Sequence, residues 1–181
     1  YGFIPQQSSE SEFKKSYARA ALKVGLTADQ VVKVYALETG GNGRYDDQPI
    51  RRDGTAISTA LGYVQMLNAN SVRALARYGN VIAGELDVAG KHTKALVVRR
   101  MARDALTPGP GWGSLQTFAK TPAGRAMHAT ILDVDIGPRM QMQKLKDVVD
   151  AAKEGGWATP TPAQIELLNL AGEVNGLLML K

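Results

Sequence analysis

The sequence predicts a single, mainly α-helical domain over residues 1–181, with a small β-hairpin or irregular β element between the second and third helices. Apolar residues recur at helical spacing in most segments, and several segments open with a capping box or a Thr-Pro pair. Only residues 40–57 are instead rich in turn-forming residues. A chain of 181 residues, 44% apolar and 22% charged, is long enough for one domain with a real core.

The first two helices have the clearest boundaries. A capping box starts the first helix at Ser9, and Gly25 is expected to stop it. The second helix is expected to begin at Thr27 and to end at Glu38 or at the following threonine, before two glycines. Further helices are predicted over 71–79, 93–106 and 114–119, from Thr121-Pro122 to Lys153 with a break or kink at Gly137-Pro138, and from Thr161-Pro162 onwards.

Composition excludes several classes of function. The absence of cysteine excludes disulfides, thiol catalysis and thiolate metal sites. The histidines, His92 and His128, are far apart and lack the carboxylate pattern of a metal site. No apolar run approaches the roughly 18 residues of a membrane span. Asp133 and Asp135, which flank an apolar residue, are expected to face solvent on a helix.

A net charge of +5 and a pI near 9.5 favour a polyanionic partner such as nucleic acid, an anionic membrane surface or a cell-wall polymer. The basic residues are scattered, and no basic run alternates with aromatic residues, so nucleic acid is not expected. Because the chain begins at Tyr1 rather than Met, we expect a mature chain that has lost an export signal.

Glu38 is the strongest candidate for catalysis. It closes the apolar stripe of the second helix, on the same face as Val31, Val34 and Tyr35. A carboxyl group at the edge of a core loses hydration, which favours its protonated form, and a protonated carboxyl is what a general acid requires. Alternatively, Glu38 turns to solvent at the helix end or pairs with an arginine.

The chain is expected to become helical again from Ser58, and the segment Gly62-Tyr63-Val64-Gln65 lies inside this apolar helix start. Together with Glu38-Thr39, this order resembles the lysozyme-like fold, and the motifs are most similar to those of bacterial lytic transglycosylases. These enzymes typically carry Glu-Ser at a helix end, then Gly-Leu-Met-Gln, and later Ala-Tyr-Asn-Ala-Gly. The nearest match to the third motif is the segment 171–176, which lacks the tyrosine and displaces the asparagine, Asn175, by one position.

The resemblance implies cleavage of peptidoglycan by one glutamate, Glu38, which first acts as acid and then as base for the sugar's own 6-hydroxyl. A second carboxylate, a metal or an organic cofactor is then not required. Thr39, Gln65, Tyr63 and Asn175 would shape the substrate site. The structural alternatives are a core position for the tyrosine and a backbone-capping role for the glutamine.

Other functions are compatible with the same residues. Asp46 and Asp47 follow Glu38 at a spacing similar to that at which some phage-type lysozymes carry a second carboxylate. A second carboxylate at Asp47, or at Asp46, would make the protein a hydrolase. Alternatively, both aspartates have the ordinary role of turn-forming residues. A non-catalytic module that binds a glycan or a protein is a further alternative, and a nucleic-acid binder is a weaker one. Trp112, in a Pro/Gly loop, either lines a sugar cleft or fills the loop. The expected protein is a monomeric, periplasmic or extracellular peptidoglycan-cleaving enzyme.

Overall fold

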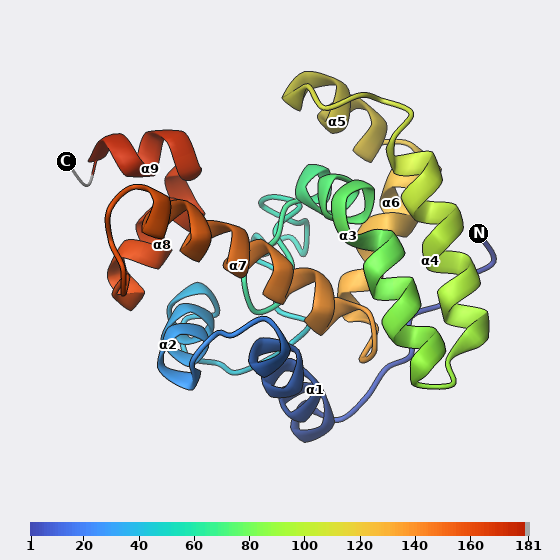
Figure 1. Ribbon diagram of the computed structural model, residues 1–181. Helices are drawn as coiled ribbons and strands as arrows, with labels where there is room; N and C mark the ends of the chain where they lie inside the picture. Colours follow the sequence, from blue (N-terminus) through green and yellow to red (C-terminus); the bar gives the residue numbers. More distant parts are fainter. Residues whose placement is uncertain (180–181) are drawn as a thin grey trace.

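The computed structural model describes residues 1–179, which form nine α-helices and one short 3-10 helix (Figure 1). The mainly α-helical class predicted from the sequence is therefore confirmed. The last two residues of the predicted domain, 180–181, lie outside this description. The elements are α1 (Glu10–Lys23), α2 (Ala28–Glu38), α3 (Asn68–Val88), α4 (His92–Ala105), α5 (Trp112–Ala119), α6 (Pro122–Ala129), η1 (Thr130–Leu132), α7 (Gly137–Glu154), α8 (Pro162–Ala171) and α9 (Glu173–Met179).

The predicted helix starts are found where capping was expected. Ser9 and Thr27 form complete capping boxes at the starts of α1 and α2, and Thr161 does the same for α8. Thr121 caps α6, with proline in its first turn. Each cap satisfies backbone N–H groups that a helix start leaves without partners.

Helix α7 lies at the centre of the arrangement and contacts α1, α3, α8 and α9 (Figure 1). Helices α3 and α4 form a long hairpin on one side, whereas α8 and α9 lie on the other. One hydrophobic core connects these layers, and its largest fully buried side chains include Phe13, Tyr63, Met66 and Leu75. Burial of each such side chain contributes about 1.5–3 kcal/mol of transfer free energy.

Helix α3 extends nine residues beyond Gly79, where the sequence predicted its end. Gly79 is not a stop signal but a packing position, because a Cβ atom there would lie 2.5 Å from the Cβ of Ala102 in α4. A glycine inside a helix costs about 1 kcal/mol relative to alanine. Here the close approach of two helices requires it.

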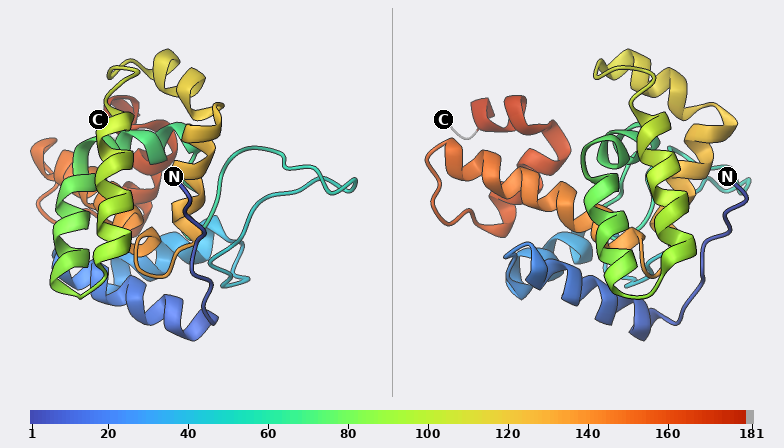
Figure 2. Two further views of the ribbon diagram at one scale, coloured as in Figure 1. Left: turned by 90° about the vertical axis from the view of Figure 1, so that its right-hand side faces the viewer. Right: turned by 45° about the vertical axis from the view of Figure 1, so that its right-hand side comes forward.

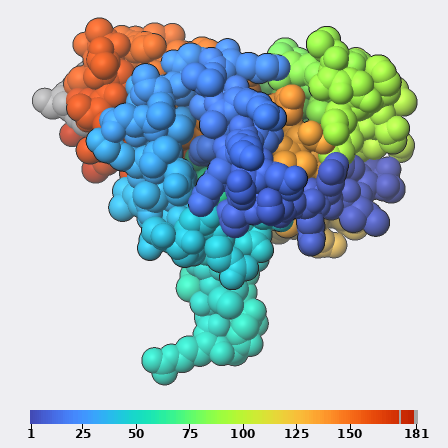
Figure 3. Space-filling model, turned by 90° about the horizontal axis from the view of Figure 1, so that it is seen from below, coloured from blue at the N-terminus to red at the C-terminus, as the bar shows by residue number. Residues whose placement is uncertain are grey.

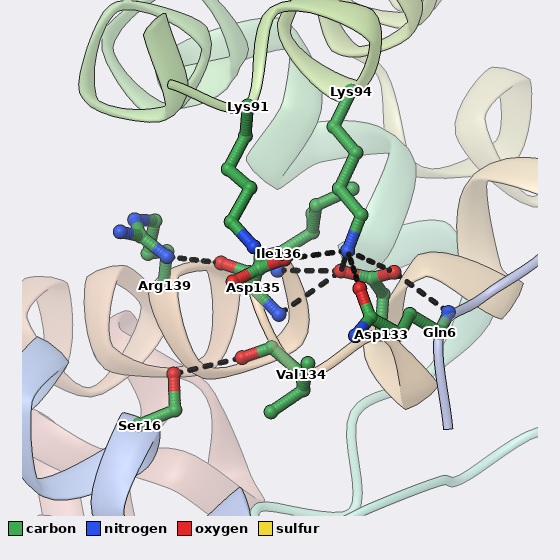
Figure 4. A network of polar contacts seen from close by, with 9 residues as sticks. All are labelled: Gln6, Ser16, Lys91, Lys94, Asp133, Val134, Asp135, Ile136 and Arg139. Atoms are coloured by element: carbon green, nitrogen blue, oxygen red, sulfur yellow. Dashed lines mark hydrogen bonds and ion pairs between the residues drawn. The ribbon is translucent and has the colours of Figure 1, made fainter. Parts of the chain in front are cut away.

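The break predicted at Gly137-Pro138 is present, but the segment before it is not a solvated helix. Figure 4 shows a polar network around Asp133, which is fully buried rather than exposed as predicted. Its carboxylate accepts hydrogen bonds from the backbone N–H groups of Gln6 (2.8 Å) and Ile136 (3.1 Å) and pairs with Lys94 at 3.0 Å. Lys94 also pairs with Asp135 at 2.5 Å. The network ties the N-terminal segment and α4 to the start of α7, a long-range arrangement that local sequence does not reveal.

The chain between α2 and α3 includes an arm, residues 48–58, that projects from the body of the protein (Figures 2 and 3). The predicted β element is wrong as a hairpin of strands: the described residues contain no strand, and the arm has one isolated bridge, between Ile50 and Ala56. Pro49 has no N–H to donate to a ladder, and an isolated two-stranded hairpin is marginal in water. Within residues 1–179, no helix is both long and apolar enough to span a membrane.

Candidate active site

Glu38 is the last residue of α2 and is half-buried. The packing of Val31 and Val34 into the core orients α2 so that Glu38 meets α8. There the side-chain Nδ2 of Asn169 donates a hydrogen bond of 2.6 Å to Oε1 of Glu38. The predicted position of Glu38, at the edge of the core, is therefore the observed one, and its partner is an amide rather than an arginine.

The Glu38 side chain lines a cleft of about 370 Å³ between α2, α7, α8 and the base of the arm. The described residues that line it with Glu38 are Pro49, Ala60, Gln65, Leu67, Asn70, Lys144, Asn169 and Leu170. A second hollow of about 630 Å³ shares four of these residues, Leu67, Asn70, Asn169 and Leu170, and extends to Trp112 and Asn175. The two hollows therefore form one elongated cleft, called the Glu38 cleft below.

Gln65 lines the Glu38 cleft, but its amide group is largely engaged with the backbone. Nε2 donates to the carbonyl oxygens of Gly62 (2.9 Å) and Asp47 (3.1 Å), while Oε1 is buried without a hydrogen-bond partner among the described residues. Gln65 also has a φ of +42°, in the left-handed region that side chains other than glycine rarely adopt. The backbone-capping alternative thus describes its nitrogen, and its buried oxygen is not open to a substrate in this conformation.

The segment 62–65 is a turn and not the predicted helix start, since the chain reverses between the bridged residues Leu61 and Met66 and α3 begins only at Asn68. The other residues of this segment have structural roles. Gly62 has a φ of +78°, and a Cβ atom there would lie 2.9 Å from the Ile131 side chain. Tyr63 is fully buried and donates a hydrogen bond of 2.8 Å to Glu10, so it belongs to the core rather than to a sugar-binding surface. It packs edge-on to Phe13 and Tyr17. The core alternative for this tyrosine is the one observed.

Thr39 does not reach the Glu38 cleft. It is 4% exposed, and its hydroxyl donates a hydrogen bond of 2.7 Å to the carbonyl oxygen of Tyr35. The residue therefore closes the last turn of α2. Its hydroxyl is directed to the helix backbone, which is a common use of threonine near a helix end.

Neither aspartate of the predicted second-carboxylate pair is among the described residues that line the Glu38 cleft. Asp46 forms an exposed ion pair with Arg44 at 3.1 Å. The Asp47 carboxylate accepts a hydrogen bond of 2.6 Å from the Asn42 amide, and its backbone oxygen accepts from Gly62 at 3.0 Å. Both side chains thus take part in local turn contacts.

Trp112 and Asn175 lie at the far part of the Glu38 cleft. Trp112, in the first turn of α5, is 38% exposed, and the Arg73 guanidinium lies 5.2 Å from its ring centroid. Asn175 is exposed on α9. Gly172, with a φ of +80°, ends α8, and Gly176 allows α9 to approach Leu168 closely. The asparagine next to Glu38 is therefore Asn169, not Asn175.

Three residues of this site were not predicted from the sequence: Lys144 of α7, and Glu166 and Asn169 of α8. Glu166 is 5% exposed, and its burial beside Glu38 raises its pKa to about 7. Burial lowers the pKa of Lys144 to about 8. The one sequence signal was the spacing of Glu166 and Asn169, which places both on one face of α8 beside its apolar stripe.

His128 forms a separate polar contact between α6, α3 and the base of the arm. Its Nε2 lies 2.7 Å from the carbonyl oxygen of Thr59, to which it can only donate, so its Nδ1 accepts from the Ser71 hydroxyl at 2.8 Å. Ser71 is fully buried, which withholds its hydroxyl from any substrate. The pair anchors the arm and does not form a nucleophilic site.

Among residues 1–179, no three His, Asp or Glu side chains come together in a way that could hold a metal ion. Comparisons of the chain with known protein families, with curated proteins and with solved structures find no match. The chemistry of the Glu38 cleft therefore has to be inferred from its own residues.

Proposed function

We propose that the protein is a lytic transglycosylase that cleaves the β-1,4 bond between N-acetylmuramic acid and N-acetylglucosamine in peptidoglycan, with Glu38 as acid and base. The observation that carries this proposal is the half-buried carboxyl of Glu38 in the wall of an elongated cleft that both polar and apolar residues line. An extended glycan fits such a shape, and a positioned carboxyl is the group that glycoside cleavage needs. The lysozyme-like resemblance of the motifs around Glu38 and Gln65 supports the same reaction.

The reaction requires two proton transfers at Glu38. First, its carboxyl proton moves to the glycosidic oxygen, and the bond from this oxygen to the muramic acid C1 breaks, with its electron pair left on the oxygen. Then the 6-hydroxyl oxygen of the same sugar bonds to C1, and the hydroxyl proton returns to Glu38. The products are a shortened strand and a 1,6-anhydro end, without consumption of water.

The contacts of Asp47 favour this reaction over hydrolysis. A hydrolase needs a second carboxylate that activates water or attacks C1, at about 5–9.5 Å from the acid across the scissile bond. Asp47 is hydrogen-bonded to Asn42, outside the residues that line the cleft. Hydrolysis with Glu38 and Asp47 is the second candidate, since the Asp47 carboxylate, whose one side-chain hydrogen bond among the described residues comes from Asn42, can turn when substrate binds.

Two further features suit a glycan. Gln65 holds a strained backbone conformation at the cleft wall, and such strain concentrates at sites where function requires a defined geometry. The net charge of +5 would assist approach to an anionic wall polymer, and action on that polymer would place the protein in the periplasm or outside the cell.

The test is mass spectrometry of purified peptidoglycan after incubation with the wild-type protein and with Glu38→Gln and Asp47→Asn variants. We expect 1,6-anhydromuramic ends from the wild type and from Asp47→Asn, and none from Glu38→Gln. Reducing ends that depend on both carboxylates would identify the hydrolase instead. Peptidoglycan that is bound in a pull-down but never cleaved would refute catalysis and indicate a binding module.

A further inference from the structure

A smaller hollow opens beside the Glu38 cleft, between α3, α7 and α8. It has a volume of about 140 Å³, and Asn70 and Asn169 line both this hollow and the cleft. Arg73 of α3 and Lys144 of α7 also line it. Pockets for whole small molecules usually have volumes of about 300–1,000 Å³. The smaller hollow, called the Arg73 branch below, therefore has room for one group of a ligand whose main part lies in the cleft.

The side chains that line the Arg73 branch carry an excess of positive charge. The one carboxylate among its described lining residues, Asp147, accepts hydrogen bonds from Arg77 (3.0 Å) and from Tyr78. This carboxylate balances the charge of Arg77. Arg73 and Lys144, in contrast, form no ion pair with any residue that the structure describes. Two positive charges therefore line one small hollow without a carboxylate in direct contact.

Lys144 is the more informative of these two cations, because its ammonium group is poorly hydrated. Its side chain is half-buried, and burial lowers its pKa to about 8, although the charges of Glu38 and Glu166 act in the opposite direction. Neither glutamate is in ion-pair contact with it, so its three N–H donors have no acceptor among the described residues. An anion in direct contact would supply that acceptor and stabilise the charged form.

Arg73 and Asn70 add further donors on one face of α3, because they are three residues apart in the helix. Arg73 is exposed, and its guanidinium lies 5.2 Å from the ring centroid of Trp112. A guanidinium that stacks on a ring keeps the N–H groups at its edge available for a carboxylate in its own plane. The Asn70 side chain forms no hydrogen bond within the described part of the chain. The branch thus combines two cations with an unused amide, a set of donors that suits a carboxylate.

We propose that the Arg73 branch binds a carboxylate carried by a side group of the glycan, with Arg73, Lys144 and Asn70 as hydrogen-bond donors. The identity of the ligand, a peptide branch of peptidoglycan, rests on the proposed function, whereas the carboxylate site is a property of the protein alone. Glu38 repels an anion, but Lys144 lines both hollows, so its charge offsets this repulsion. The protein would therefore prefer strands that carry acidic branches over neutral strands.

The first test compares sedimentation of the protein with intact peptidoglycan and with the same preparation after its carboxylates have been converted to amides. At about 0.5 M salt, where scattered surface charges are largely screened, we expect amidation to weaken binding roughly tenfold. Arg73→Gln should reduce this ratio to less than about threefold, and Arg73→Lys should keep more of it. Arg19→Gln, an exposed arginine of α1, is the matched control and should leave the ratio unchanged. Equal binding of both preparations, or an unchanged ratio in Arg73→Gln, would refute the proposal.

The second test needs neither peptidoglycan nor activity. In ¹⁵N-labelled protein, replacement of chloride by acetate at constant ionic strength should shift the signals of Asn70 and Arg73 in a saturable way. This response should be lost in Lys144→Gln and kept in Arg19→Gln. A response that survives in Lys144→Gln, or that is equal at all exposed arginines, would refute the carboxylate site. Saturable acetate binding by a protein that does not cleave peptidoglycan would refute only the proposed function, and cleavage of intact and amidated peptidoglycan at equal rates would refute only the branch.

Discussion

Replacement of Asp133 by alanine should be among the most damaging single changes in this protein. The carboxylate is fully buried and accepts hydrogen bonds from the backbone N–H groups of Gln6 (2.8 Å), Asp135 (3.0 Å) and Ile136 (3.1 Å). It also pairs at 3.0 Å with Lys94, whose side chain is only 17% exposed. Asp133→Ala removes all four contacts at once (Figure 4).

The expected cost follows from the groups left behind. Loss of one partner from a buried ion pair costs about 3–5 kcal/mol, because the remaining charge is desolvated without compensation. Lys94 keeps Asp135 at 2.5 Å, which favours the lower part of this range. The three backbone N–H groups that lose their acceptor increase the cost, by about 1 kcal/mol or more each. We therefore expect the free energy of unfolding to fall by at least about 3 kcal/mol.

Urea unfolding followed by circular dichroism measures this change, provided that the slope with denaturant stays constant. Asp29→Ala is the control, since Asp29 pairs with Lys33 on the exposed surface of α2 and should contribute less than about 0.5 kcal/mol. A cycle with Lys94→Met should give a coupling energy of about 0.5–3 kcal/mol. A loss below about 1 kcal/mol for Asp133→Ala, or strictly additive effects, would refute the assignment of this network as a major stabilising contact.

Two further predictions concern helix packing and pH. Gly79→Ala should lower the melting temperature, because its new Cβ meets the Ala102 side chain at 2.5 Å. Gly84→Ala on the same helix has open space around the new Cβ and should raise the free energy of unfolding by about 0.5–1 kcal/mol. Equal effects of the two substitutions would contradict the packing argument. Burial lowers the pKa of His128 in the folded state, so the unfolded chain binds its proton first and stability should fall as pH drops through about 6.5. Replacement of His128 by glutamine, which can still pair with Ser71, should reduce the change of the unfolding free energy between pH 7 and 5. An unchanged dependence of this free energy on pH would contradict the account.

Features that depend on neighbours in the chain were predictable. The capping boxes at Ser9, Thr27 and Thr161 mark helix starts because the side chain and the backbone that it caps are three residues apart. The position of Glu38, at the end of an amphipathic helix and at the edge of the core, follows from the same short-range periodicity. The end of α3 was misplaced because glycine is both a helix terminator and a residue that permits close packing, and Gly79 acts in the second way.

The sequence by itself thus determined the helical class, most helix starts and the location of Glu38 at the edge of the core, since all of these depend on interactions within one or two turns. Only the tertiary structure decided which polar groups surround that carboxyl group. Asn169 and Glu166 are more than 120 residues from Glu38, and Lys144 comes from a third helix. The burial of Asp133 likewise depends on Gln6 and Lys94. A charged residue has the same local pattern whether its partner is water or a distant side chain, so only the packing of the helices distinguishes the two.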